Sequence, residues 1–208
     1  QRTGIGTDMV DVAYAKAKGI PISICKGFNS VSVAELAILN MLALYRRLPF
    51  MDATMKKGEW HTWTHRHASF ELTGKTVGIV GAGAIGRHVM KRVKAFDCEV
   101  LYYDLVRMSE AEEQKFGAVF CELDKLLSTS DVITTKGMIG AEQLHNMKAS
   151  AILINTARDL LIDLDALAEA MLKREIMGAA IDVLDPLTEA SPLYKAKDTN
   201  LILTPHIG

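Results

Sequence analysis

The sequence predicts an α/β fold with a doubly wound, mainly parallel sheet, and three observations support this prediction. A strand pattern at Thr76–Val80 runs directly into a glycine-rich turn. After that turn, strand-like and helix-like segments alternate to the end of the chain, which is typical of a parallel sheet with helices on both faces. The 208 residues are 49% hydrophobic, so the chain can bury a sizeable core in one large domain or two unequal ones.

The glycine-rich turn has the spacing Gly-x-Gly-x-x-Gly at Gly81, Gly83 and Gly86. Gly81 permits a tight turn, Gly83 lets backbone N–H groups approach a pyrophosphate, and Gly86 lets the next helix pack closely on the strand. That helix directs the positive end of its dipole at the phosphates. A second strand pattern at 100–103 ends in Asp104, at the distance where dinucleotide-binding folds place the acid that binds the ribose. These features favour a dinucleotide site over a purely structural turn.

The other elements follow from hydrophobic periodicity. Helices are expected at 109–116, 123–127, 140–147 and from Asp163 onward, and strands at 118–120, 131–135, 151–155, 178–183 and 200–204. Ahead of the glycine turn, the pattern indicates a short helix at 12–17 and a strand at 20–24. These two resemble the tail of a separate domain, because one such unit cannot bury both faces of a sheet.

A long helix is expected from Ser32 to about Leu48. Ser32 and Glu35 form a capping-box pattern at its start, and Pro49 is expected to stop it. Apolar residues occur nearly all round this helix, so several of its sides must be covered. A subunit interface and burial between two domains explain this pattern equally well.

Composition excludes some classes of partner. The net charge of −1 offers no basic surface for nucleic acid, and the apolar run at 31–44 is too short to span a membrane. The three cysteines have no metal-binding spacing, and their odd number with no signal peptide indicates the reducing cytoplasm. His61, His65 and His67 lie in what is expected to be a solvated loop anchored by its aromatic residues, so no metal site is predicted.

Several motifs then occur together in one order: VSVAEL at 31–36, the stretch 74–86, Tyr103-Asp104, INTAR at 154–158, GAAIDV at 178–183 and TPHI at 204–207. In order and spacing they resemble the D-isomer-specific 2-hydroxyacid dehydrogenases over nearly the whole chain. The resemblance implies a Rossmann-type NAD-binding domain at 29–205 and a smaller, flavodoxin-like substrate domain. Residues 1–28 would be a remnant of that substrate domain, and residues 206–208 would return towards it. The resemblance also implies an active site between the domains and a homodimer built on the helix at 32–48.

The same resemblance implies an NAD-dependent oxidoreductase that interconverts a small 2-keto acid and its D-2-hydroxy acid by hydride transfer. Arg158 matches the arginine that binds the substrate carboxylate, since a planar guanidinium can hold both oxygens. His206 matches the acid/base histidine, and the unperturbed imidazole pKa of about 6.5 suits that work. The residues expected to bind the cofactor are Gly81, Gly83, Ala84, Ile85, Gly86, Asp104, Thr156, Ala157, Arg158, Asp182 and His206.

Asp104 favours NAD over NADP because a carboxylate accepts hydrogen bonds from ribose hydroxyls and repels a 2′-phosphate. Arg107 lies close enough in sequence to accommodate that extra phosphate. NAD is therefore the expected cofactor, and NADP is the less favoured alternative. The substrate side chain is not identified, although Arg2 is a weak candidate for an anion contact.

Four features depart from the family pattern. In relatives a glutamate pairs with the histidine. In this chain the position of that glutamate holds Leu187 or is deleted, which leaves Asp185 and Glu189 as imperfect substitutes. A longer loop is missing after Thr135, Asp159-Leu160 replaces two glycines, and the first part of the substrate domain is lacking. These departures indicate either deletions or segments of a longer protein that this sequence omits after Thr135, after Pro186 and at both ends. They leave open an alternative function, an NAD(H)-binding module without turnover that serves as a redox-sensing or scaffolding subunit.

Overall fold

A seven-stranded parallel sheet forms the centre of the computed structural model, which describes residues 6–7 and 10–208. Its order is β3-β2-β1-β4-β5-β6-β7, and every neighbouring pair is parallel. The strands are β1 Thr76–Val80, β2 Glu99–Tyr103, β3 Ala118–Phe120, β4 Val132–Thr135, β5 Ile152–Asn155, β6 Gly178–Ile181 and β7 Leu201–Leu203. This arrangement confirms the predicted fold class of the sheet.

The strand order reverses between β1 and β4. The chain moves outward from β1 through β2 to β3, then returns to the other side of β1 and continues outward from β4 to β7. In open α/β sheets such a reversal opens a crevice beyond the carboxyl ends of the strands, where ligands bind. The glycine turn follows β1, so it lies at this crevice.

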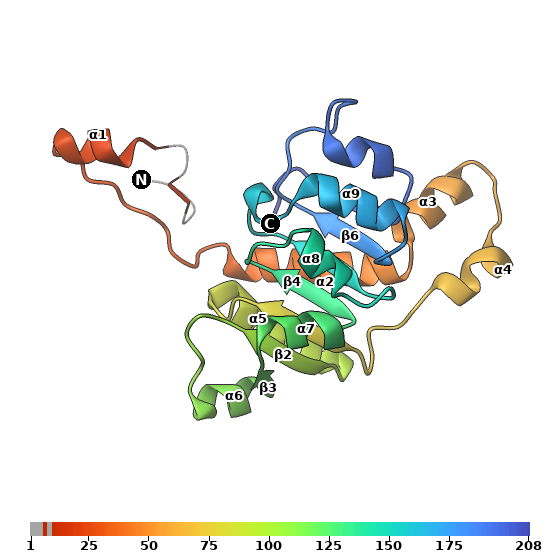
Figure 1. Cartoon of the computed structure of the whole chain (residues 1–208), viewed down its shortest axis with the longest axis horizontal. Helices are drawn as coiled ribbons and strands as arrows, with labels where there is room; N and C mark the ends of the chain where they lie inside the picture. Colours follow the sequence, from red (N-terminus) through yellow and green to blue (C-terminus); the bar gives the residue numbers. More distant parts are fainter. Residues whose placement is uncertain (1–5, 8–9) are drawn as a thin grey trace.

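Helices cover both faces of the sheet (Figure 1). The helices α2 (Ser30–Tyr45) and α5 (Ala84–Val93) lie on one face, and α7 (Leu123–Thr129), α8 (Ala141–His145) and α9 (Leu164–Leu172) lie on the other. Each face has its own buried cluster, and alternate residues of one strand enter different clusters, as in β5, where Ile152 and Ile154 face the α2 side and Leu153 faces the α9 side. Burial on both faces explains why the central strands consist mostly of apolar residues.

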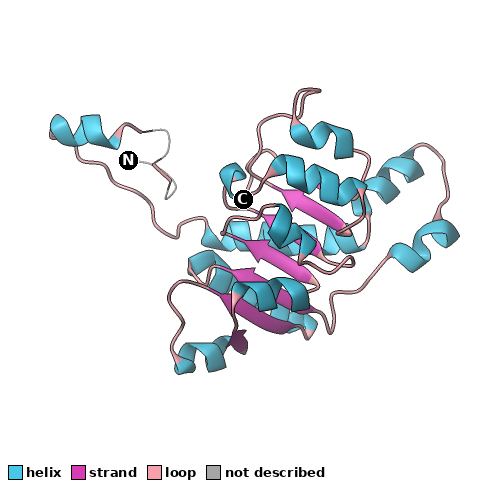
Figure 2. Ribbon diagram, in the orientation of Figure 1, coloured by secondary structure: helices cyan, strands magenta, loops and turns pink. Residues whose placement is uncertain are grey.

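The remaining helices lie outside these two layers, and α1 (Val12–Ala17) stands apart from the body at the end of an extended segment (Figure 1 and Figure 2). The others are α3 Leu48–Lys56, α4 Thr62–His65 and α6 Glu110–Phe116, with short 3₁₀ turns at Arg66–Ala68, Lys94–Phe96, Asp159–Leu161 and Pro192–Ala196. The predicted end of α6 is confirmed, because Gly117 has a φ of +57°, a left-handed value that favours glycine. None of the helices in the described part of the chain is long and apolar enough to cross a membrane.

The predicted boundaries of the long helix were wrong at both ends. Asn29 precedes α2 without a side-chain cap, and the Ser32 hydroxyl donates to the Asn29 carbonyl at 2.9 Å. Glu35 accepts instead from Arg92 on α5, at 2.7 Å. At the other end α2 stops at Tyr45, and Pro49 lies in the first turn of α3, where a missing N–H costs little because the first helical amides have no intrahelical acceptor.

The region outside the sheet also differs from expectation. The strand expected at 20–24 does not form, since only Ile24 makes a bridge and the residues before it are irregular. The loop expected at 58–72 contains α4, and its two tryptophans do not anchor it, because Trp60 and Trp63 are 74% and 75% exposed. The domain boundary near residue 28 stays a prediction, and Arg2 lies outside the described residues.

Candidate cofactor and active site

The glycine turn has the shape that a pyrophosphate requires. Gly81 has a φ of +105°, and its N–H donates to the Tyr103 carbonyl at 2.8 Å, which ties the turn to the end of β2. A side chain at Gly86 would lie 2.1 Å from the Gly81 carbonyl oxygen, so only glycine lets α5 start this close to β1. At Gly83, by contrast, a side chain would meet nothing within 4 Å. The open space above Gly83 is where a ligand can approach the backbone.

The first amides of α5 face that open space. Gly83 is the N-cap of α5, and no side chain caps the helix there. The N–H groups of the first helical turn therefore have no intrahelical acceptor, and the helix dipole adds partial positive charge at the same place. Ala84 and Ile85 supply these amides, and the arrangement fits a bound anion such as a dinucleotide pyrophosphate.

Asp104 lies beside the turn, half-buried after β2. Its Oδ2 accepts a hydrogen bond from the Ala82 N–H at 2.7 Å, so the carboxylate is fixed against the phosphate-binding turn. Oδ1 forms no hydrogen bond with any described residue, and a carboxylate oxygen retains lone pairs for ribose hydroxyls.

Arg107 is engaged elsewhere. Its Nε and Nη2 donate to the two carboxylate oxygens of Glu113 at 2.8 and 3.0 Å. The hydrogen bonds from Arg107 and from the Tyr102 hydroxyl lower the pKa of Glu113 to about 2, which keeps the pair ionised at neutral pH. An arginine held by a bidentate carboxylate is poorly available to a 2′-phosphate, so the preference for NAD that Asp104 indicates is strengthened.

The end of β5 presents Arg158 through a turn that Asn155 organises. Asn155 is fully buried, its Oδ1 accepts from the Ala157 N–H at 2.9 Å, and its Nδ2 donates to the Arg158 carbonyl at 2.8 Å. The side chain of Arg158 is exposed and donates to the Ala157 carbonyl at 2.6 Å. Thr156 is half-buried at the same strand end. The position of the Asp159 side chain lies outside what the structure describes.

Asp182, at the end of β6, holds the segment that carries His206. It is 1% exposed, and its carboxylate accepts from the Thr204 hydroxyl at 2.6 Å and from the N–H groups of Ile207 and Gly208 at 3.0 and 3.1 Å. Its own carbonyl accepts from the His206 N–H at 2.7 Å. The His206 backbone is left-handed, with a φ of +58°, and its side chain is exposed.

Backbone hydrogen bonds join these strand ends. The Asp182 N–H donates to the Asn155 carbonyl at 2.9 Å, and the His206 N–H donates to the Asp182 carbonyl. The segments after β5, β6 and β7 are thus fixed side by side, and Arg158 and His206 lie along the same edge of the sheet as the glycine turn. The structure brings these predicted site residues to one edge.

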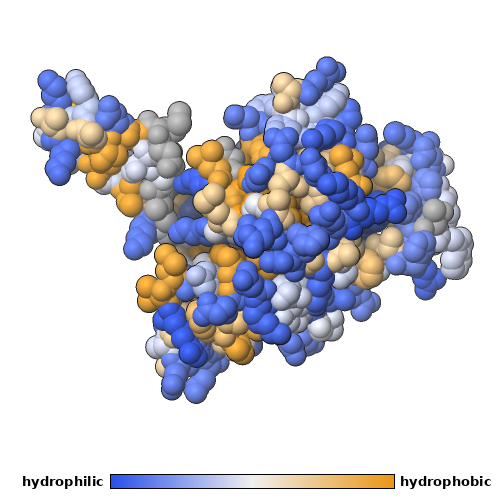
Figure 3. Space-filling model, viewed as in Figure 1, coloured by the Kyte–Doolittle hydropathy of each residue, from blue (hydrophilic) through white to orange (hydrophobic). Residues whose placement is uncertain are grey.

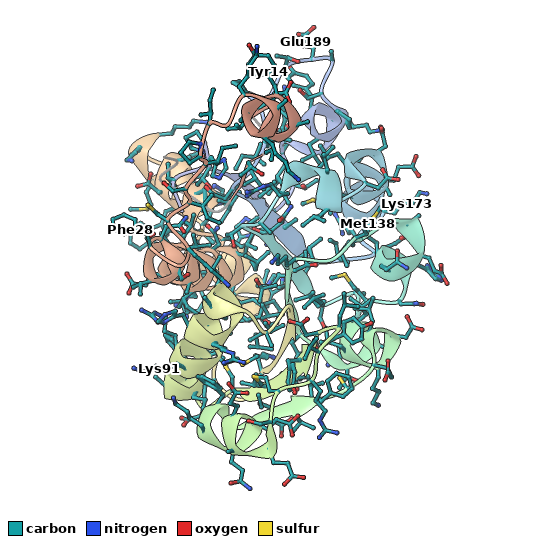
Figure 4. All side chains as sticks on the ribbon, turned by 90° about the vertical axis from the view of Figure 1, so that its left-hand side faces the viewer. Tyr14, Phe28, Lys91, Met138, Lys173 and Glu189 are labelled. Atoms are coloured by element: carbon teal, nitrogen blue, oxygen red, sulfur yellow. The ribbon has the colours of Figure 1, made fainter. Side chains whose placement is uncertain are left out.

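Glu189 is not brought to His206. It lies at the exposed tip of the loop after β6, labelled at the extreme top of Figure 4, and Asp185 is exposed in the same loop. Among the described residues neither carboxylate forms a hydrogen bond or ion pair with His206. The catalytic role considered for Glu189 therefore remains a prediction without a contact to support it.

Exposed apolar side chains follow the strand ends at this edge. They are Leu105 and Val106 after β2, Met138 after β4, Leu160 after β5 and Ile207 after β7, all between 62% and 90% exposed. Figure 3 shows hydrophobic residues on the side of the body that faces α1, the side towards which the strands point in Figure 2. Apolar surface at a ligand-binding edge is typical of a face that contacts a ligand or another domain.

Two residues that organise the site were missed from the sequence. Asn155 and Thr204 are assigned no ligand contact, but they fix the turns that present Arg158 and His206. The available signal was that Asn155 is a polar residue at the end of the buried strand β5 and that Thr204 directly follows β7, since polar side chains that become buried must find partners. In the part of the chain that the structure describes, no three His, Cys, Asp or Glu side chains lie close enough to hold a metal ion.

The sheet order, the glycine turn and the acid after β2 define a Rossmann-type NAD-binding domain. The model of the D-isomer specific 2-hydroxyacid dehydrogenase NAD binding domain matches residues 38–208. The chain belongs to this family, and NAD is its cofactor.

Relatives of known name agree with this assignment. The D-3-phosphoglycerate dehydrogenase of Archaeoglobus fulgidus is 38% identical over 217 residues, which cover 100% of this chain and 40% of the relative. The mitochondrial formate dehydrogenase of Solanum tuberosum is 36% identical, with 99% of this chain and 56% of the relative covered. The D-lactate dehydrogenase of Aquifex aeolicus, solved with NAD and lactic acid, has a TM-score of 0.84 at 33% identity, with 98% and 67% of the two chains covered.

This chain spans about half the length of the curated relatives it matches. The alignment with the Archaeoglobus fulgidus protein extends over 217 positions although this chain has 208 residues, so the relative carries residues that are lacking here.

Proposed function

We propose that this chain is the cofactor-binding part of an NAD-dependent dehydrogenase that interconverts a small 2-keto acid and its D-2-hydroxy acid. The observation that carries the proposal is that the glycine turn, Arg158 and His206 lie along one edge of the sheet. Backbone hydrogen bonds through Asp182 set the spacing of the last two. Family membership and the names of the relatives support the same reaction class.

In this proposal Gly83, Ala84 and Ile85 bind the pyrophosphate and Asp104 binds the adenosine ribose. Thr156, Ala157 and Asp182 line the nicotinamide end. The nicotinamide, when bound, supplies or accepts the hydride. Arg158 holds the substrate carboxylate through its guanidinium, and His206 gives a proton to the substrate oxygen during reduction or removes it during oxidation.

A second candidate, oxidation of formate, is favoured by one observation. Among the described residues no carboxylate forms a hydrogen bond or ion pair with His206, so none of them orients its ring. Formate already lacks the proton that a hydroxy acid must lose, and transfer of its hydride to NAD releases carbon dioxide without an acid/base group. Arg158 would still bind the formate oxygens, and the formate dehydrogenase of Solanum tuberosum is among the similar proteins.

A substrate panel tests both candidates and the module without turnover. NADH oxidation is measured with glyoxylate, pyruvate, hydroxypyruvate and 3-phosphohydroxypyruvate, and NAD reduction is measured with formate. The leading proposal predicts reduction of at least one keto acid and its loss in His206→Ala with NADH affinity unchanged. Activity on formate alone, insensitive to His206→Ala, would support the second candidate. Binding of NADH with no turnover on the whole panel would support the module.

We also propose that the protein is a homodimer built on α2. Most of α2 is buried within the chain, yet Val31 and Leu39 on it are 43% and 55% exposed, and Phe28 just before it is 82% exposed. A Leu39→Glu substitution is expected to shift the sedimentation coefficient from dimer to monomer. A wild-type monomer at micromolar concentration would contradict this. We also propose a reducing compartment such as the cytoplasm, which is supported by the lack of a disulfide among the three cysteines in the described part of the chain.

A further inference from the structure

Lys136 lies directly over the phosphate-binding turn. A methyl group built on Gly81 would lie 3.2 Å from Cβ of Lys136 and 3.7 Å from its Cδ. The aliphatic stem of the lysine therefore runs across the turn between β1 and α5. These two residues are far apart in the sequence, and the side chain of Lys136 is exposed to solvent at the edge where the cofactor binds.

The backbone around Lys136 is fixed. Its N–H donates to the Val80 carbonyl at 2.9 Å, which extends the pairing of β4 with β1 by one residue. The Thr135 hydroxyl then accepts from the Gly137 N–H at 2.9 Å and donates to the Gly137 carbonyl at 3.0 Å. Lys136 is thus held at the turn rather than carried on a free loop.

Further on, the same segment is tied to the chain after Arg158. The Ile139 N–H donates to the Leu161 carbonyl at 2.8 Å, and the Asp163 N–H donates to the Ile139 carbonyl at 3.0 Å. These hydrogen bonds form a parallel bridge between Ile139 and Ile162. The short connection after β4 is therefore anchored at both ends, which fixes the backbone of Lys136 beside the turn.

Lys136 is available to a ligand, whereas two described arginines near the turn are paired with carboxylates. Arg87, on α5, is paired with Glu112, and Arg107 is paired with Glu113. Among the described residues no carboxylate pairs with Lys136. An ammonium group on a flexible four-carbon stem can reach an anion bound above the turn, and its three donors suit phosphate oxygens.

We propose that Lys136 binds the pyrophosphate of the dinucleotide and compensates part of its negative charge. The proposal rests on the cofactor site described above and assigns it a charged side chain in addition to the backbone amides. The amides at Gly83 to Ile85 fix the position of the phosphates, and Lys136 closes over them from β4. Lys136 then increases affinity for any ligand that carries the pyrophosphate, whether or not it carries nicotinamide.

Equilibrium binding of NADH, ADP-ribose and adenosine by calorimetry tests this on wild type, Lys136→Met and Lys136→Arg. Methionine keeps most of the apolar stem over Gly81 and removes the charge, so it separates charge from packing. The expected result is about tenfold weaker binding of NADH and ADP-ribose by Lys136→Met at low salt, near wild-type binding by Lys136→Arg, and no change for adenosine. The loss should shrink as salt is raised, because ions screen an exposed charge.

Lys57→Met is the matched control, because Lys57 is also exposed but lies at the end of α3, away from the turn. Equal melting temperatures show that the variants are folded. Wild-type affinity for ADP-ribose in Lys136→Met, or an equal loss for adenosine, would overturn the role of Lys136 while leaving the cofactor site intact. Failure of wild type itself to bind NADH or ADP-ribose would instead overturn the cofactor site on which the proposal rests.

Discussion

Substitution of Asp182 tests whether this buried carboxylate holds the segment that carries His206. Asp182→Asn keeps the shape of the side chain and one acceptor oxygen. Its NH₂ group, however, would face the N–H of Gly208, which is itself a donor. Three hydrogen bonds reach the native carboxylate, from Thr204, Ile207 and Gly208. A hydrogen bond to a charged group contributes about 1.5–3 kcal/mol when buried.

The expected loss for Asp182→Asn is smaller than the sum of three such bonds. The Thr204 and Ile207 donors can keep the remaining oxygen, and the exposed end of the segment regains water. We therefore expect about 2 kcal/mol less free energy of unfolding, and about 3–4 kcal/mol for Asp182→Ala, which removes all three acceptor contacts. For a chain of this size, 2 kcal/mol lowers the melting temperature by about 4–8 °C.

Urea denaturation and amide hydrogen exchange at Ile207 and Gly208 measure these effects. The control is Asp165→Asn, because Asp165 is 72% exposed and faces Lys195 at 3.8 Å. That change should stay within about 0.5 kcal/mol. If Asp182→Asn matched the control in stability, and the two amides exchanged no faster than in wild type, Asp182 would not hold the segment.

Three other predictions concern the glycine turn and its neighbours. Gly86→Ala should destabilise the fold by about 3 kcal/mol, because its Cβ would lie 2.1 Å from a backbone oxygen that cannot move aside, whereas Gly83→Ala should leave the melting temperature unchanged. Arg107 lowers the pKa of Glu113 to about 2 from the ordinary value of 4.5, so the stability that the ionised Glu113 contributes is complete above pH 4.5 and is lost as the pH falls towards 2. Glu113→Gln should therefore flatten the acid unfolding curve between these pH values. An unchanged curve would contradict the ion pair. Asp104→Asn should weaken NADH binding about tenfold and reduce the preference over NADPH, and an unchanged preference measured by competition would refute its role.

The parts of the fold that depend on local sequence were predictable. Gly81, Gly83 and Gly86 have their effect through backbone geometry within one turn, so their spacing alone indicated the phosphate-binding turn. The strands could be assigned because both faces of the sheet are buried, which makes segments such as 151–154 apolar throughout. The end of α6 followed from Gly117 for the same local reason.

The features that the sequence did not reveal depend on residues far apart in the chain. Ser32 and Glu35 match a capping box, but Glu35 pairs with Arg92 on another helix, and local hydrogen-bonding rules cannot weigh that competitor. Lys136 reaches the glycine turn only because β4 lies beside β1 in the folded sheet. The link from Asp182 to the His206 segment likewise requires β6 and β7 to be neighbours.

Titration of the protein with NADH, followed by calorimetry, tests the central claim that the glycine turn binds the dinucleotide. We expect saturable binding by wild type. We also expect about tenfold weaker binding by Gly83→Ala at an unchanged melting temperature, since the added methyl group occupies the space where the pyrophosphate approaches the backbone. Absence of saturable binding by wild type, or equal affinity in Gly83→Ala, would contradict a dinucleotide site at this turn.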